Sequence, residues 1–140
     1  MNAALLLQWL VGALGGSMLF FAIVVAPTSF HALPADMSGV FLRRLFPLYY
    51  LWGLAISLLS TSIAFYAADG IAGTVCAIVA LLFVYVRVGL LPQLDRLRQA
   101  RQDGDPAATR RFRRLHLQSV LINFAQLALL IGISLYPNQS

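Results

Sequence analysis

Long apolar stretches alternate with shorter polar segments along the chain. The four apolar stretches, which hold a single charged side chain among them, are residues 3–25, 48–68, 71–91 and 117–136. An α-helix rises about 1.5 Å per residue, so about 20 residues cross the roughly 30 Å hydrocarbon core of a bilayer. The pattern predicts an all-α, polytopic membrane protein with four transmembrane helices in an up-down bundle, forming a single membrane domain over residues 1–140.

Helical signals continue in the polar connections. Pro27 is expected to end span one, and the apolar stripe that follows it predicts a short interfacial helix. Pro47 is expected either to start span two or to kink it. The members of that stripe are Met37, Val40, Phe41, Leu45 and Phe46. In the second polar connection, Asp105 is a suitable N-cap and Pro106 a suitable first helical residue, so one helix should run from there into span four. We therefore expect helical extensions of spans three and four outside the membrane.

The distribution of charge predicts an orientation. All ten basic residues are arginines, and apart from Arg87 they lie in the two polar connections. The positive-inside rule places both connections and the helical extensions in the cytoplasm, with the N- and C-termini on the other side. The chain is 60% hydrophobic, has a mean hydropathy of +0.80 and carries a net charge of +5. Its expected partner is therefore a bilayer with anionic headgroups, and not nucleic acid.

Small residues recur at helix-packing intervals in spans one and two. Gly12 and Gly16 form a GxxxG pair, and Gly53, Ser57 and Ser60 follow one another at steps of four and three. Small residues let helix backbones approach closely, so both sets predict helix packing, either within the chain or in a dimer. A homo-oligomer is expected in addition because four helices enclose little volume.

One face of span four carries a polar stripe. Its members are His116, Ser119, Asn123 and Gln126, spaced by three, four and three residues. Polar groups need partners in hydrocarbon, so the stripe should face inward or toward another subunit. Arg87 lies at a comparable depth, and we expect it to donate to the stripe. Two interpretations stay open: the stripe fixes helix register, or it lines a cytoplasm-facing vestibule for a small solute or ion.

The chain offers little chemistry for catalysis or for a metal. It has no glutamate, no Gly-flanked nucleophilic serine and no phosphate-binding glycine loop, so no enzymatic activity is expected. Cys76 is the only cysteine, which excludes a disulfide within the chain. His31 and His116 are expected near the same membrane surface and are weak candidates for a shared haem or metal site, because no repeated ligand spacing accompanies them. No cofactor is therefore expected.

Three blocks of sequence resemble a known family. They are Phe41–Tyr50 with its Leu-Phe-Pro-Leu-Tyr-Tyr core, Arg87 with Leu90-Leu91-Pro92, and Arg111–His116 followed by Ser119 and Asn123. Together they cover nearly the whole chain and are similar to the transmembrane-protein-205-like family, also described as domain of unknown function 4149. The resemblance implies a four-helix membrane protein without an assigned activity in bacteria, whose eukaryotic relatives are linked to transport or drug resistance.

The sequence hypothesis is a non-enzymatic, multi-pass protein of the bacterial inner membrane that takes part in the transport of a small solute or ion. Its N- and C-termini are expected to be periplasmic. Two alternatives stay open. One is a haem- or metal-binding redox subunit that uses His31 and His116, and the other is a non-catalytic scaffold or assembly partner in the membrane.

Overall fold

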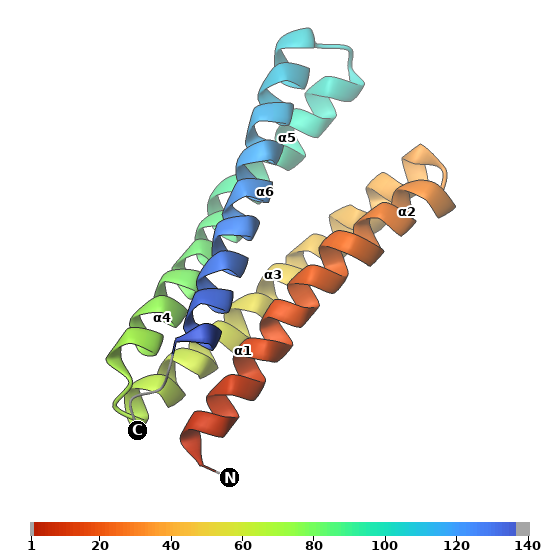
Figure 1. Ribbon diagram of the computed structural model, residues 1–140. Coiled ribbons are helices and arrows are strands. Elements are labelled where there is room, and N and C mark those ends of the chain that lie inside the picture. The colour runs from red at the N-terminus through yellow and green to blue at the C-terminus, as the bar shows by residue number, and fades with distance from the viewer. Residues whose placement is uncertain (1, 137–140) are drawn as a thin grey trace.

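The computed structural model describes residues 2–136, which fold as four long helices joined by short turns (Figure 1). The elements in chain order are α1 (Ala3–Phe20), the π-helical turn η1 (Phe21–Val25), α2 (Ala26–Ala32), α3 (Ala35–Tyr66), α4 (Gly70–Tyr85), the π-helical turn η2 (Val86–Leu90), α5 (Leu91–Gln102) and α6 (Pro106–Leu135). α1, η1 and α2 follow one another without a break, as do α4, η2 and α5. Each of the four helices is long and apolar enough to cross a membrane, which confirms the predicted fold class.

Side-chain caps define where three of the helices begin. The side-chain oxygens of Asn2, Asp69 and Asp105 accept backbone N–H groups at the starts of α1, α4 and α6, at 2.8, 3.0 and 2.9 Å. Each cap satisfies an N–H group that the first turn of a helix leaves unpaired. The predicted helix start at Pro106 is confirmed, and the helical extensions on either side of the last turn are present as α5 and the first part of α6.

The helices are arranged as two hairpins (Figure 1). The first hairpin consists of α1, α2 and α3, and the second of α4, α5 and α6. The hairpins pack together at the end that holds the start of α1 and the end of α6, where α3 lies along α4 and α1 contacts α6. They diverge toward the opposite end, where the turns at residues 33–34 and 103–105 lie. The arginine-rich segments of both hairpins therefore lie at the diverging end.

Two predicted boundaries are wrong. The interfacial helix is not a separate element, because residues 35–66 form the single helix α3, which runs through Pro47. Pro27 does not end the first helix either, which continues to Ala32. A proline is tolerated inside a membrane helix where neighbouring groups satisfy the carbonyls that it leaves free. Such neighbours come from other helices, so the local sequence pattern does not reveal them.

The two π-helical turns occupy corresponding places in the two hairpins. Each closes with a backbone bond from residue i+5 to residue i, and the N–H donor, Ala26 or Leu91, immediately precedes a proline. Proline has no N–H group, and its ring crowds the carbonyl four residues earlier. The wider turn lets the helix pass the proline without a break. As a result, the first and third helices extend into the diverging half of the molecule.

The small residues fall into two groups by their surroundings. Gly53, Ser57 and Ser60 are buried on α3, and a Cβ atom at Gly53 would lie 2.3 Å from the Phe83 ring of α4. Gly53 therefore allows α3 and α4 to pack directly. Gly12 and Gly16 are exposed, and a Cβ atom at either would have nothing within 4 Å. Of the two predicted roles, packing within the chain is wrong for this pair, and packing in a dimer stays a prediction.

Candidate functional site

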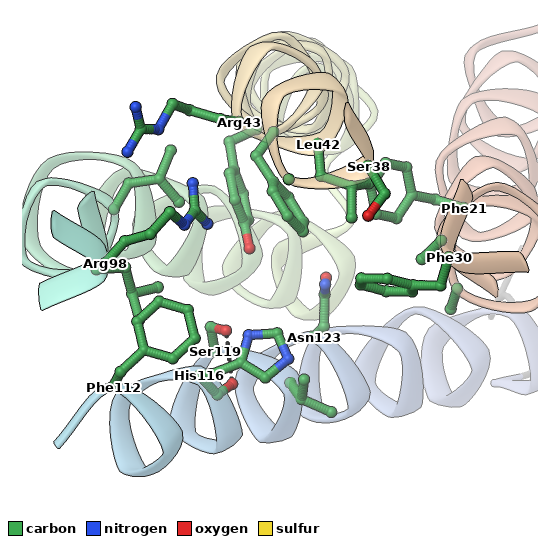
Figure 2. Close-up of a pocket in the computed structure, with 18 of the residues that line it drawn as sticks. Phe21, Phe30, Ser38, Leu42, Arg43, Arg98, Phe112, His116, Ser119 and Asn123 are labelled. Carbon is green, nitrogen blue, oxygen red and sulfur yellow. Dashed lines mark hydrogen bonds between the residues drawn. The ribbon is translucent and has the colours of Figure 1, made fainter. Parts of the chain in front are cut away.

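A pocket lies between the two hairpins where they diverge. Its volume is about 610 Å³, and its lining residues come from α1, η1, α2 and α3 on one side and from α5 and α6 on the other. Figure 2 shows side chains from both hairpins pointing toward one another across it. Pockets of about 300–1,000 Å³ commonly hold small molecules. This pocket is therefore the candidate binding site.

One end of the pocket is mainly apolar, and the Ser38 hydroxyl that lies there donates to the Ala35 carbonyl of its own helix. Phe21 and Phe30 lie there, on the same side of the view in Figure 2. The Phe21 ring stacks on the ring of Tyr49, with 4.3 Å between the ring centres. The Tyr49 hydroxyl in turn donates to Asn123 Oδ1 of α6 at 3.0 Å, which ties α3 to α6 beside the pocket. These contacts hold Phe21 in place before any ligand arrives.

Basic side chains gather at the opposite end of the pocket (Figure 2). Arg43 Nε and Arg98 Nη1 each lie 3.4 Å from one oxygen atom, Asp95 Oδ1. The guanidinium carbons of Arg98 and Arg101 lie 5.8 and 4.6 Å from the centre of the Phe112 ring, within the range of cation–π attraction. We call these five residues the basic cluster. It joins α3, α5 and α6 at the edge of the pocket.

The basic cluster keeps an excess of positive charge, because three guanidinium groups face a single carboxylate. Partial burial lowers the pKa of Arg98, and the charges of Arg43 and Arg101 act in the same direction while Asp95 opposes them. The pKa of His116 is lowered first by partial burial and then by the charge of Arg98, and both effects favour the neutral imidazole. Both groups lie outside the four apolar spans. A negatively charged ligand group would relieve the repulsion among these cations.

The polar stripe divides between the pocket and the protein core. His116, Ser119 and Asn123 line the pocket. Gln126 is fully buried, and its Nε2 donates to the Val79 carbonyl of α4 at 3.1 Å. The stripe therefore has two parts: its deepest member links α6 to α4, and the other three supply hydrogen-bonding groups along the pocket.

Arg87 has a different partner from the one predicted. Its Nη1 donates to the Pro47 carbonyl of α3 at 2.8 Å, and not to the polar stripe of α6. The expected depth of Arg87 in the membrane suggested a partner on α6. Arg87 lies in η2, however, which contacts α3 as well as α6. The bond links the two hairpins beside the proline of α3. Arg87 does not line the pocket.

The two histidines are not brought together in the pocket. His116 lines it, whereas His31 is exposed on α2, does not line it, and has its Nδ1 2.7 Å from the Pro27 carbonyl. Within residues 2–136, no group of three His, Cys, Asp or Glu side chains could hold a metal ion. The arrangement therefore gives no geometric support to a haem held by both histidines.

A family model described as a domain of unknown function, DUF4149, matches residues 9–103, which is more than half of the chain. The chain belongs to the DUF4149 family. The DUF4149 match runs from α1 into the turn after α5 and includes four members of the basic cluster, Arg43, Asp95, Arg98 and Arg101. No curated protein and no solved structure matches the chain significantly.

The DUF4149 match contains two of the three sequence blocks on which the resemblance rested. Phe41–Tyr50 and Arg87–Pro92 lie inside it, whereas the block that begins at Arg111 lies beyond its end, in α6. The family description assigns no activity. The function of this DUF4149 protein must therefore be argued from the pocket.

Sequence reasoning did not identify the basic cluster of this DUF4149 protein. One local signal was present, because Asp95, Arg98 and Arg101 are spaced by three residues and share a face of α5. Arg43 and Phe112 complete the cluster from α3 and α6, and no local pattern connects such distant segments. The arginines of the second connection were instead expected to face lipid headgroups in general.

Proposed function

We propose that this protein binds a molecule with an apolar body and a negatively charged end in the pocket between its hairpins, and assists the movement of that molecule in the bacterial inner membrane. The role is non-enzymatic and requires only binding and release. The arginine-rich end faces the cytoplasm and both termini face the periplasm, as the positive-inside rule indicates.

The proposal rests on the different character of the two ends of the pocket. Phe21 and Phe30 form an apolar end, and the basic cluster forms the other. A bare ion or a strongly hydrated solute finds few partners among aromatic side chains, whereas an anionic amphiphile matches both ends. The pocket thus favours a narrower class of ligand than the small solute or ion expected from the sequence.

The bundle is tightly filled in the half where the hairpins pack together. Val79, Phe83 and Gln126 are each 0% exposed there. A ligand therefore reaches the pocket from the diverging half. Movement across the whole membrane would require the hairpins to rearrange, and movement within one leaflet would not.

A pair of neighbouring residues on α6 provides the test. Val120 lines the pocket, whereas Leu121 is exposed and does not line it. Val120→Trp should fill the pocket and weaken the binding of a fluorescent fatty acid about tenfold, because the new ring occupies the ligand volume. Leu121→Trp should bind like the unmodified protein. Fluorescence titration of the purified proteins in detergent measures both, and equal affinities in the two variants would refute a ligand in this pocket.

A haem-binding redox subunit is the second candidate, because His116 lines the pocket and could supply one axial ligand. We expect no haem absorption band in the purified protein. If the purified protein has a Soret band and His116→Ala lacks it, the protein binds haem, and the proposal that it binds an anionic amphiphile is wrong.

A further inference from the structure

We infer that the ligand of the pocket is an anionic phospholipid of the surrounding bilayer, and that it enters sideways between α2 and α6. Its phosphate binds at the basic cluster and an acyl chain occupies the apolar end. This inference rests on the proposed function: it names the ligand class and adds the route by which the ligand arrives.

Arg98 and Arg101 have the free donors that a phosphate needs. The Arg98 side chain is only 19% exposed, and its one hydrogen bond within the described residues is a long contact of 3.4 Å with Asp95. A guanidinium group carries five N–H donors in a planar fork, so most of them are available to a ligand. Arg101 lies over the face of Phe112, which holds its guanidinium at the same edge. Two such groups bind the several oxygens of a phosphate well.

The depth of the basic cluster corresponds to the position of lipid headgroups. Arg98 lies on α5 about 10 Å of helix rise beyond residue 91, where the apolar span ends. Phe21, Ile23 and Phe124 line the pocket within spans one and four, and Phe30 lies just beyond the end of span one. A phospholipid already lies with its phosphate at the surface and its chains toward the membrane centre. It can therefore enter the pocket without inverting.

The pocket is open toward the bilayer on one side. Within the described residues, α2 packs against α3, and its backbone stays apart from that of α6, with no Cα atoms of the two helices within 8 Å of each other. Phe30 of α2 and Phe124 of α6 both line the pocket and are 62% and 60% exposed. On the side toward α5, the ion pair between Arg43 and Asp95 bridges the hairpins. The gap between α2 and α6 is therefore the side from which an acyl chain passes into the pocket.

Free phosphate offers the same chemistry to the arginines as a lipid headgroup does. It would use only the basic cluster and leave the aromatic end in contact with water, which is unfavourable. A phospholipid fills both ends. The lipid is therefore the favoured source of the phosphate, and inorganic phosphate becomes one arm of the test.

Two double variants separate the pocket arginines from the general charge of the loop. Arg98→Gln with Arg101→Gln removes two cations that line the pocket, whereas Arg96→Gln with Arg111→Gln removes two that do not. The proteins are reconstituted with equal amounts of phosphatidylglycerol and phosphatidylcholine, and the retained lipids are measured by native mass spectrometry. Phosphatidylglycerol retention should fall about tenfold in the first double variant and stay unchanged in the second. Equal losses in both, or no preference for phosphatidylglycerol in the unmodified protein, would overturn the inference.

The phosphate source and the route are tested separately. Millimolar inorganic phosphate should leave the bound phosphatidylglycerol in place, and its displacement would assign the basic cluster to free phosphate. Phosphatidylglycerol with a photoreactive acyl chain should label α2 and α6, with the labelling lost in Val120→Trp. Equal labelling of the lipid-facing side of α4 would overturn the sideways route.

The fatty acid titration distinguishes this inference from the function on which it rests. If the protein retains no phosphatidylglycerol but Val120→Trp still weakens fatty acid binding, the phospholipid is excluded and the proposed function stands. If neither ligand binds, both are overturned.

Discussion

Gly53 sets the distance between α3 and α4. A Cβ atom at this position would lie 2.3 Å from the buried Phe83 ring, so Gly53→Ala forces the two helices apart or displaces the ring. We expect the free energy of unfolding to fall by about 1–3 kcal/mol, as for other overpacked cores. Thermal unfolding in detergent measures the change.

Gly16 provides the matched control for that substitution. It lies on a helix surface where an added Cβ has nothing within 4 Å. In the monomer, Gly16→Ala should leave stability unchanged or raise it slightly, because alanine favours helix more than glycine does. A Gly53→Ala protein as stable as Gly16→Ala would show that α3 and α4 do not pack as closely as described.

His116 should make lipid binding depend on pH. Its imidazole lines the pocket beside Arg98, whose charge together with partial burial lowers the pKa of His116 below its ordinary value. The charged groups that face the pocket here are Arg43, Asp95, Arg98 and Arg101. An anionic ligand favours the protonated imidazole, so affinity should rise as the pH falls through the His116 pKa and should be lowest above about pH 6.5.

Phosphatidylglycerol is the appropriate probe of this effect, because a phosphodiester keeps one charge over the range from about pH 5 to 8. Its retention should increase a few-fold between pH 8 and pH 5 in the unmodified protein, and the increase should be absent in His116→Gln. An unchanged pH profile in the variant would assign the titration to another group.

The π-helical turns determine which way the ends of the first and third helices face. In η2 the widened turn precedes Pro92, and α5 with its arginines follows directly. Pro92→Ala restores an N–H group and should convert η2 to regular α-helix. One residue corresponds to about 100° of helix rotation, so Arg98 and Arg101 should turn away from the pocket. Phosphatidylglycerol retention should therefore fall several-fold, while circular dichroism should show that the helix content is kept.

Pro106→Ala is the control for the π-turn variant, because Pro106 lies in the first turn of α6, where proline costs no helical hydrogen bond. It should leave lipid retention unchanged. Retention that is equally high in Pro92→Ala would show that η2 does not orient the basic cluster.

The four helices could be predicted from the sequence because each carries an uncharged apolar stretch of membrane-spanning length. Their ends could not all be predicted. Pro47 was expected to start span two or to kink it, after a separate interfacial helix, but a single helix, α3, runs through it. The bond from Arg87 to the Pro47 carbonyl was not predicted either. That contact joins residues 40 positions apart. No local pattern contains it.

From the sequence, only the part of the candidate site that lies on a single helix could be predicted. The spacing of the polar stripe suggested that His116, Ser119 and Asn123 share a face of α6, and all three line the pocket. The basic cluster depends on how the hairpins diverge. The angle between the hairpins depends on packing along the whole length of the bundle and on the π-helical turns, so no local sequence pattern predicts it.

The two hairpins have the same layout across the whole molecule. In each, a long helix containing a π-helical turn is followed by a short turn and a second long helix, and both first helices start at the same end. The bond from Arg87 to Pro47 and the bond from Tyr49 to Asn123 tie the two hairpins together. Binding sites of membrane transporters commonly lie between such related halves. The pocket likewise lies between two halves, but at the end where they diverge.

The orientation of the molecule follows from its two ends. The diverging end holds the turn at residues 103–105 and nearly all the arginines, while the opposite end holds the α3–α4 turn with Asp69. We expect the arginine-rich end to be cytoplasmic. Gln102→Cys should then resist a membrane-impermeant thiol reagent in intact cells, whereas Ala67→Cys should react once the outer membrane is permeabilised. Both variants are made in a Cys76→Ala background, since Cys76 is buried.

Lysing the cells should expose Gln102→Cys to the same reagent, which excludes burial as the reason for its protection. Labelling of Gln102→Cys in intact cells would show that the topology is the reverse of the one expected. The basic cluster would then face the periplasmic leaflet, and the pocket would draw its phospholipid from that leaflet. The labelling pattern therefore decides which half of the bilayer supplies the ligand, because the basic cluster lies at headgroup level on one side only.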